Sequence, residues 1–553
     1  MKFAPLTFQD LPPDIIRIIV KHLTDNSRLH YSGVSPDTSV YSQLQEPLLQ
    51  VSRTWRAVVY SKLCQYCQVS LVPEPERVLV EQMSLPANMR APEIPTNHFA
   101  NAVWIHVDFW SVFNGRALRM LSQAQPALMF PSARQVRVYF ISMDSDHDIG
   151  SFNDAEQRVV QFIQYFRQMV PAATDITLVN NAIVDAPTTL IMRLVNRLAI
   201  GLYRNATRVS LTTFGQAPPM PLDADQLSRL THINYESDKN YEQFVRIIRH
   251  NADTLVSLSI NSRQHIDVRS LVTDNASNSV VYHGLLKLTI KLRSYQFDTV
   301  KPNVRDVDPF PSLQQLSVTP VYAFGDDTLF RGNHSSLEFL NIMMDTKTIG
   351  MIKDRGVFAD SKYTKLQHIK LSGLQHFESA TSALVEFPQH MLPALRSLEL
   401  VFRYTLYQNM FSDIANTAGF ERLQMLSLGN VGLPFSGIIS LVKSMTLLCD
   451  IHCEMSSMDI NPQGITNAKL PPHMHATYFP LSHKFRFWNM VTCQKTSPKN
   501  AAAAALLMAV MCPDFSCAAV AVYEKESYTA ELRKAMRVAG FRKFASQCKK
   551  LFY

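Results

Sequence analysis

The sequence predicts an α/β fold: a repeat solenoid in which a curved parallel sheet carries outer helices, preceded by a small all-α domain. Three observations predict it. An aliphatic triplet recurs along most of the chain, apolar helical stripes lie between several of the triplets, and two short amphipathic segments come before them all. An α/β domain of another kind is the alternative.

The composition is that of a folded chain and shows no pattern of nucleotide chemistry. Of the 553 residues, 46% are hydrophobic and 18% are charged, which excludes wholesale disorder. The 17 glycines form no G-x-G-x-x-G, G-x-x-x-x-G-K or G-x-S-x-G pattern. We therefore predict no cofactor and no enzymatic activity.

The cysteines and the hydropathy predict a cytoplasmic or nuclear location. No apolar run reaches the roughly 18 residues that span a bilayer, and the amino terminus lacks an apolar signal core. The chain has eight cysteines, mostly far apart, which favours a reducing compartment. We predict no membrane partner.

The net charge of +8 is concentrated near the carboxy terminus, where seven basic residues and no acidic one lie between Arg533 and Lys550. We predict a basic capping helix over residues 523–553, with an acidic partner or a membrane surface as the alternative role. A nucleic-acid-binding protein more often carries a broad basic patch, so no nucleic acid is predicted.

Two segments near the amino terminus have the apolar period of short helices. Residues 11–23 begin with Leu-Pro-Pro-Asp, and proline suits the first turn of a helix. Their aliphatic residues recur at spacings of three and four, as do those of residues 48–59, which include Trp55.

Together these two segments resemble an F-box, which opens with Leu-Pro-x-acidic and later shows aliphatic-x-x-Val-Ser-Arg-x-Trp-Arg. The resemblance covers about a tenth of the chain and predicts an F-box-like helical domain over residues 1–71. A polar loop at 24–46 makes the link between the segments longer than is usual in the family. The alternative is a pair of core helices that cap the solenoid. The residues that the resemblance assigns to adaptor binding are Leu11, Pro12, Ile15, Ile19, Leu48, Val51 and Trp55.

After a proline-punctuated linker over residues 72–100, the pattern aliphatic-x-x-aliphatic-x-aliphatic recurs. The clearest copies begin at Leu255, Leu285, Leu313, Leu337, Leu366, Leu395 and Leu423. Weaker copies begin at Ala102, Ala133, Ala173, Ala206, Leu230 and Leu448. From Ile233 to Ile451 the central residues lie 25, 30, 28, 24, 29, 29, 28 and 25 apart.

This spacing resembles that of leucine-rich repeats, in which each unit is one strand with a helical or irregular return. Apolar stripes predict three returns as helices, within residues 154–170, 190–198 and 244–248. The resemblance covers residues 101–522, although no asparagine ladder is visible in the sequence. Residues 501–511 and the triplet that begins at Cys517 are predicted as a final unit.

Two motifs with metal-like spacing carry no metal prediction. Asp144-x-Asp146-x-Asp148 lacks the glycine and the acidic residue that a calcium loop needs at its sixth and twelfth positions. Cys64-x-x-Cys67 has no second pair nearby and is predicted to lie in a helix. Three histidines of a proline-rich stretch also lack acidic or cysteine partners; they are His473, His475 and His483.

On each predicted strand, the residues that alternate with the buried aliphatic residues face the concave side. We predict that this side binds a target protein. A basic group comprises Arg208, His232, Lys287 and Lys291. A mixed group comprises Phe339, Asn341, Met343, His368, Lys370, Glu399, Val401 and Met425.

The sequence is therefore similar to F-box proteins with leucine-rich repeats. That similarity implies a substrate-recognition subunit of a Skp–cullin–F-box type E3 ubiquitin ligase. The F-box would bind a Skp-family adaptor and through it a cullin, and the repeats would bind the target. The alternative is a leucine-rich-repeat scaffold with no ligase role, and an enzyme on the same fold is the third class.

Overall fold

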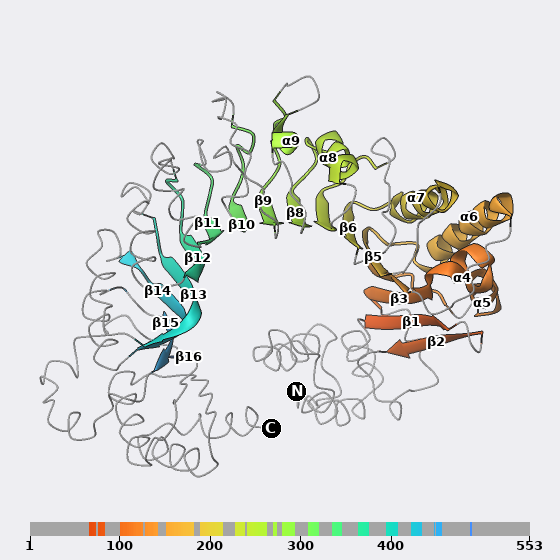
Figure 1. Ribbon diagram of the computed structural model, residues 1–553, viewed down its shortest axis with the longest axis horizontal. Helices are drawn as coiled ribbons and strands as arrows, with labels where there is room; N and C mark the ends of the chain where they lie inside the picture. The colour runs from red at the N-terminus through yellow and green to blue at the C-terminus, as the bar shows by residue number, and fades with distance from the viewer. Residues whose placement is uncertain are drawn as a thin grey trace, which may run out of the picture. The chain divides into compact units, whose positions relative to one another are not determined.

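The structure is a computed structural model, and it divides into two compact units, Met1–Arg263 and Gln264–Tyr553. Each unit is α/β and contains an open, mostly parallel sheet (Figure 1). The described residues are 66–72, 76–82, 100–124, 128–141, 151–181, 189–213, 227–237, 241–262, 269–273, 279–292, 308–319, 335–344, 363–374, 394–407, 422–433, 447, 450–455 and 487–488.

In the amino-terminal unit the described strands follow the order β8-β7-β6-β5-β4-β3-β1-β2. Every adjacent pair is parallel except β1 and β2, which are antiparallel. The strands are β1 (Tyr66–Val72), β2 (Arg77–Gln82), β3 (Ala102–Asp108), β4 (Gln135–Ile141), β5 (Asp175–Asn181), β6 (Arg208–Thr213), β7 (His232–Glu236) and β8 (Ser257–Ser262).

Helices cover one side of this sheet (Figure 1). The described helices are α4 (Phe109–Asn114), α5 (Arg116–Ala124), α6 (Phe152–Met169), α7 (Thr189–Tyr203) and α8 (Tyr241–His250). The three helical returns predicted from apolar stripes correspond to α6, α7 and α8, and are confirmed. Leu190 lies within one predicted stripe but is 45% exposed, and it is the second residue of α7.

Side-chain caps fix where two of these helices begin. Asp108 ends β3, and its carboxylate accepts a hydrogen bond from the Ser111 amide at 2.8 Å, which starts α4. Gly115 then ends α4 with φ +85°, a conformation that favours glycine. Ser151 caps α6 by accepting from the Asp154 amide at 3.2 Å.

In the carboxy-terminal unit the described strands follow the order β16-β15-β14-β13-β12-β11-β10-β9, and all adjacent pairs are parallel. They are β9 (Lys287–Leu292), β10 (Gln315–Thr319), β11 (Phe339–Met343), β12 (His368–Leu374), β13 (Ser397–Tyr407), β14 (Met425–Leu433), β15 (Asp450–Met455) and β16 (Phe487–Trp488). Its described helix is α9 (Arg269–Val272).

The predicted register of the aliphatic triplets from Ala133 onward is confirmed within each unit. In the carboxy-terminal unit, Leu316 of β10 pairs with Leu288 of β9 and Leu340 of β11. The same column continues through Ile369, Leu398, Leu426 and Ile451. The amino-terminal unit has a column of its own, formed by Val136, Ile176, Val209, Ile233 and Leu258. Apart from Ile451, whose burial is not described, these side chains are buried and form the core on one face of each sheet.

Three sequence predictions at the amino-terminal edge are wrong. Val103, not Ile105, pairs with Val136, so the first triplet begins at Ala100 and not at Ala102. Cys67 lies on strand β1, not in a helix, and is 1% exposed. Burial raises the pKa of its thiol to about 12, so it remains protonated. Strand β1 lies, except for Val72, within the range predicted to be helical, and β2 lies within the predicted linker. Parallel pairing of β1 with β3 and antiparallel pairing of β2 with β1 extend the sheet there.

A bulky buried residue recurs three positions before the first residue of many triplets. At these places a tight turn forms, in which the triplet's first amide donates to the carbonyl of the bulky residue, as from Leu313 to Phe310 at 3.1 Å. The large side chain is buried at each of these turns. Residues in this position include Phe130, Tyr203, Tyr282, Phe310 and Tyr363.

Candidate functional site: two strand faces

The partly exposed face of β9–β14 is the first candidate surface, called here the carboxy-terminal strand face. All of the predicted target-binding residues except Arg208 and His232 lie on it, because each alternates with a buried core residue. The register places Lys287, Phe339, His368 and Met425 in one row across the strands, together with Gln315 and Ser397. A second row holds Asn341, Lys370 and Glu399, and a third holds Lys291, Met343 and Val401.

The middle row is largely satisfied by contacts within the face. Lys370 Nζ lies 2.7 Å from Glu399 Oε1, with both side chains about a third exposed. Asn341 donates from Nδ2 to Ser317 Oγ at 2.8 Å. These contacts hold the side chains in place and leave Lys370 with little net charge to offer a partner.

The outer rows supply the apolar contact surface. The rings of Phe339 and His368 lie 6.4 Å apart, and Met343 packs beside Gly373, where φ is +78° and the register of β12 shifts. Burial lowers the pKa of His368, so its imidazole is mostly neutral at pH 7. Lys287 and Lys291 of β9 are exposed and positively charged.

The second candidate surface is an aromatic patch on β3 and β4, formed by Trp104, His106, Arg137 and Tyr139. The rings of His106 and Tyr139 stack at 4.6 Å. The Arg137 guanidinium lies 5.5 Å from the centre of the Trp104 ring and donates to Tyr139 Oη at 3.1 Å. Burial lowers the pKa of His106, whose Nε2 is buried without a hydrogen-bond partner, so this ring is neutral at pH 7.

The sequence prediction missed the aromatic patch, although alternation in β3 carries the signal. Trp104 and His106 alternate with buried Val103, Ile105 and Val107, as outward residues of a strand do. Tryptophan, tyrosine and arginine are also the residues enriched at the energetic centres of protein interfaces. A rigid patch of these types therefore fits contact with a protein.

The two members of the predicted basic group that lie in the amino-terminal unit, Arg208 and His232, are less positive together than their residue types suggest. Burial and the nearby Arg208 both lower the pKa of His232, so the imidazole is mostly neutral at pH 7. Its Nδ1 lies 2.9 Å from Thr231 Oγ1. Arg208 is accompanied by Asp175, which lies beside it in register. This part of the strand face is therefore nearly neutral.

The other predicted sites fall outside the described residues. These are the adaptor-binding set, the Asp144–Asp148 motif, Cys64, the three histidines of the proline-rich stretch, the Cys517 triplet and the basic terminal helix. Among the residues that the structure describes, no group of three or more His, Cys, Asp or Glu side chains is arranged to hold a metal ion. No helix in that part of the chain combines the length and the apolar character needed to cross a membrane.

A scan against protein-family models finds no family that matches the chain. A search of curated proteins likewise finds no match.

Proposed function

We propose that the protein is the substrate-recognition subunit of a Skp–cullin–F-box type ubiquitin ligase, built on a leucine-rich-repeat solenoid. The observation that carries the proposal is the regular strand face of each unit. Buried aliphatic residues fill one side of each sheet. The other side presents polar groups that hydrogen-bond to one another, together with apolar or aromatic side chains. Such a surface resembles the mixed centre of a protein interface, and stacked repeats offer it over a long stretch.

The target is proposed to contact the outer rows of the carboxy-terminal strand face. Replacing Phe339, Met343 and Met425 with alanine is expected to reduce recovery of the bound target at least about tenfold. Each anchor residue at an interface centre contributes on the order of 1 kcal/mol or more, and about 1.4 kcal/mol is a factor of ten. Affinity purification with mass spectrometry, followed by titration of the recovered protein, measures this change.

The matched control replaces Gln314, Lys365 and Arg396 with alanine. These exposed residues lie in the turns before β10, β12 and β13, in the same unit but outside the three rows. The control should bind the target as wild type does, and both variants should melt near wild type. Undiminished binding by the strand-face variant would refute the placement of the target.

The ligase part of the proposal rests on the amino-terminal motif. Replacing Leu11 and Pro12 with alanine is expected to weaken binding of a Skp-family adaptor more than a hundredfold. The double change removes one buried apolar contact, worth about 1.5–3 kcal/mol, and the preorganised start of the helix; a loss of roughly 3 kcal/mol corresponds to this factor. Co-purification with the adaptor and titration of the purified pair provide the measurement.

Thermal melting of the same double variant separates the two candidate roles of this segment. An adaptor-docking segment should leave the melting temperature almost unchanged, since repeats are stabilised mainly by their neighbours. A capping segment would instead lower the melting temperature, and wild type would bind no adaptor. If deletion of residues 24–46 also restores no adaptor binding, the chain is a repeat scaffold without a ligase role.

A further inference from the structure

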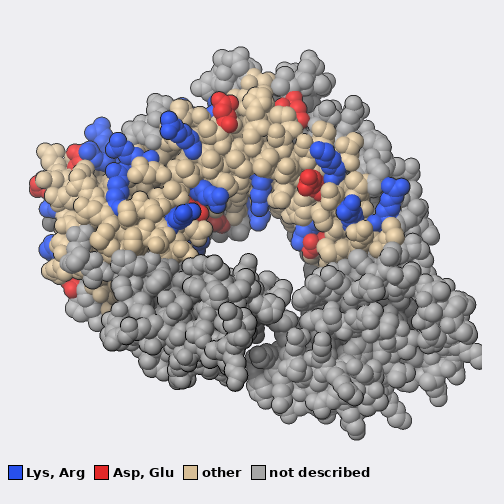
Figure 2. All heavy atoms as spheres, turned by 180° about the vertical axis from the view of Figure 1, so that it is seen from behind, with Lys and Arg blue, Asp and Glu red and all other residues tan. Residues whose placement is uncertain are grey.

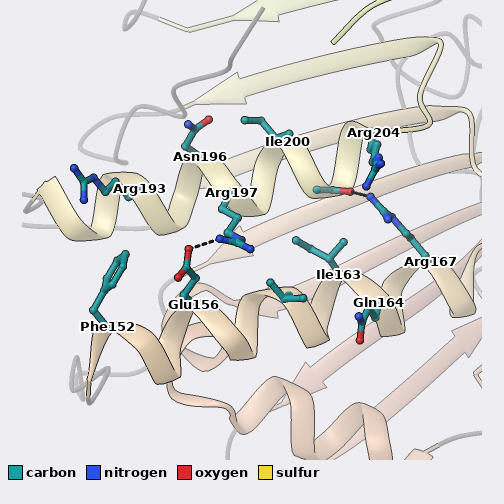
Figure 3. A pocket seen from close by; sticks show the side chains of 12 residues that line it. Phe152, Glu156, Ile163, Gln164, Arg167, Arg193, Asn196, Arg197, Ile200 and Arg204 are labelled. Atoms are coloured by element: carbon teal, nitrogen blue, oxygen red, sulfur yellow. Dashed lines mark hydrogen bonds and ion pairs between the residues drawn. The ribbon is translucent and has the colours of Figure 1, made fainter. Parts of the chain in front are cut away.

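A groove of about 940 Å³ runs between α6 and α7, on the helical side of the amino-terminal unit (Figure 3). The two helices approach closely at Gly201, where a Cβ would lie 2.2 Å from Ile163 Cδ1. Arg167 of α6 also donates to the Gly201 carbonyl at 2.9 Å, which fixes its side chain against α7. The groove is therefore part of a tightly packed helix pair on the helical side of the sheet.

Four arginines and one glutamate line this groove. Glu156 forms an ion pair with Arg197, which leaves the other three guanidinium groups without a carboxylate partner among the described residues. Lys and Arg side chains gather over this side of the amino-terminal unit, toward the left of the space-filling view (Figure 2). The groove thus has an excess of three positive charges.

The three arginines without a carboxylate partner in the described part of the chain stand at the two ends of the groove. Arg204 lies beside Arg167 at one end, and Arg193 lies near Phe152 at the other (Figure 3). Burial, and then the charge of Arg204, lower the pKa of Arg167, as expected for a partly buried guanidinium beside a second cation. Holding like charges together in this way is unfavourable unless an anion joins them.

The space between the two ends has the character of a peptide site. Val160, Ile163 and Ile200 line it with apolar surface. The Oδ1 atom of Asn196, which also lines the groove, is buried and has no hydrogen-bond partner, so it is an acceptor for an amide N–H. The sugar–phosphate backbone of a nucleic acid would leave both the apolar surface and this acceptor unused.

We propose that the groove binds an acidic, extended peptide segment of a partner protein. Arg193 lies on α7 and Arg204 directly follows its last residue, so the two are 204 − 193 = 11 residues apart, which corresponds to about 16 Å along a helix. An extended chain covers that length in roughly five residues. The segment therefore carries carboxylates about five residues apart, with an apolar side chain between them.

The test uses the full chain and a fluorescein-labelled peptide with glutamates about five residues apart and leucine between them. In fluorescence anisotropy at low salt, replacing Arg167 and Arg204 with glutamine should weaken binding at least about tenfold. Arg193→Gln alone should weaken it several-fold, and Glu156→Gln should strengthen it, because Arg197 is then released. The matched control replaces Arg134 and Arg246 with glutamine. Both are exposed arginines of the same unit and lie outside the groove.

The control should bind within about twofold of wild type, which would show that net charge alone does not account for binding. Equal loss in the control and in the groove variants would overturn the proposal, as would a wild-type chain that does not bind the peptide. Competition provides the second measurement. If inorganic phosphate or a single-stranded oligonucleotide displaces the peptide as well as an unlabelled copy does, the groove is a general anion site and the peptide assignment is wrong.

Discussion

Replacing Asn251 with alanine is expected to lower the free energy of unfolding by about 2–6 kcal/mol. Asn251 is 1% exposed and follows α8 directly. Its Oδ1 accepts from the Leu230 amide at 2.8 Å, and its Nδ2 donates to the carbonyls of Leu227 and Ile247 at 2.7 and 2.9 Å. Alanine leaves the Leu230 amide and the Leu227 carbonyl without these partners, and each such buried group costs about 1–3 kcal/mol.

Urea unfolding of the full chain, together with amide hydrogen exchange over residues 227–237, measures this loss. Asn251→Asp retains an acceptor for Leu230 but turns an oxygen toward the carbonyls of Leu227 and Ile247, so it should also be less stable than wild type. The control is Asn205→Ala, because Asn205 is exposed; its effect should stay within about 0.5 kcal/mol. If the Asn251→Ala protein were as stable as this control, the hydrogen bonds of Asn251 to Leu227 and Leu230 would not contribute to stability.

Replacing Leu316 with alanine is expected to lower the free energy of unfolding by about 2–5 kcal/mol, the range for deleting a large buried aliphatic side chain. Leu316 has no exposed surface and lies on β10 between Leu288 of β9 and Leu340 of β11. Packed neighbours on both sides limit how far the structure can close the cavity. The loss should therefore fall in the upper part of this range.

Two variants of the same strand sharpen the measurement by urea unfolding. Leu316→Met conserves volume and should cost less than about 1.5 kcal/mol. Gln315→Ala changes the exposed neighbour and should have almost no effect. If Leu316→Ala were no more destabilising than Gln315→Ala, the aliphatic column would not be the core of the sheet.

The strands and their inward faces could be predicted from the sequence because both depend on local pattern. Alternating apolar residues determine which side of a strand is buried. The predicted columns of buried residues through Leu316 and Ile233 are therefore confirmed. Helices α6, α7 and α8 were found for the same reason, from apolar residues three and four apart. The recurring bulky residue before each triplet was also readable, although the prediction did not use it.

Contacts between successive repeats required the tertiary structure. Asn251 lies 21 residues after Leu230, and the ion pair of Lys370 with Glu399 joins two strands; both depend on how neighbouring repeats align. The Arg167–Arg204 pair likewise arises from the packing of α6 on α7, permitted by the missing side chain at Gly201. Cys67 shows the converse, since its local pattern suits a helix but pairing with β3 makes it a strand. Sequence periodicity thus determined what each segment buries, whereas register and packing decided which polar and charged groups meet, because those groups lie in different repeats.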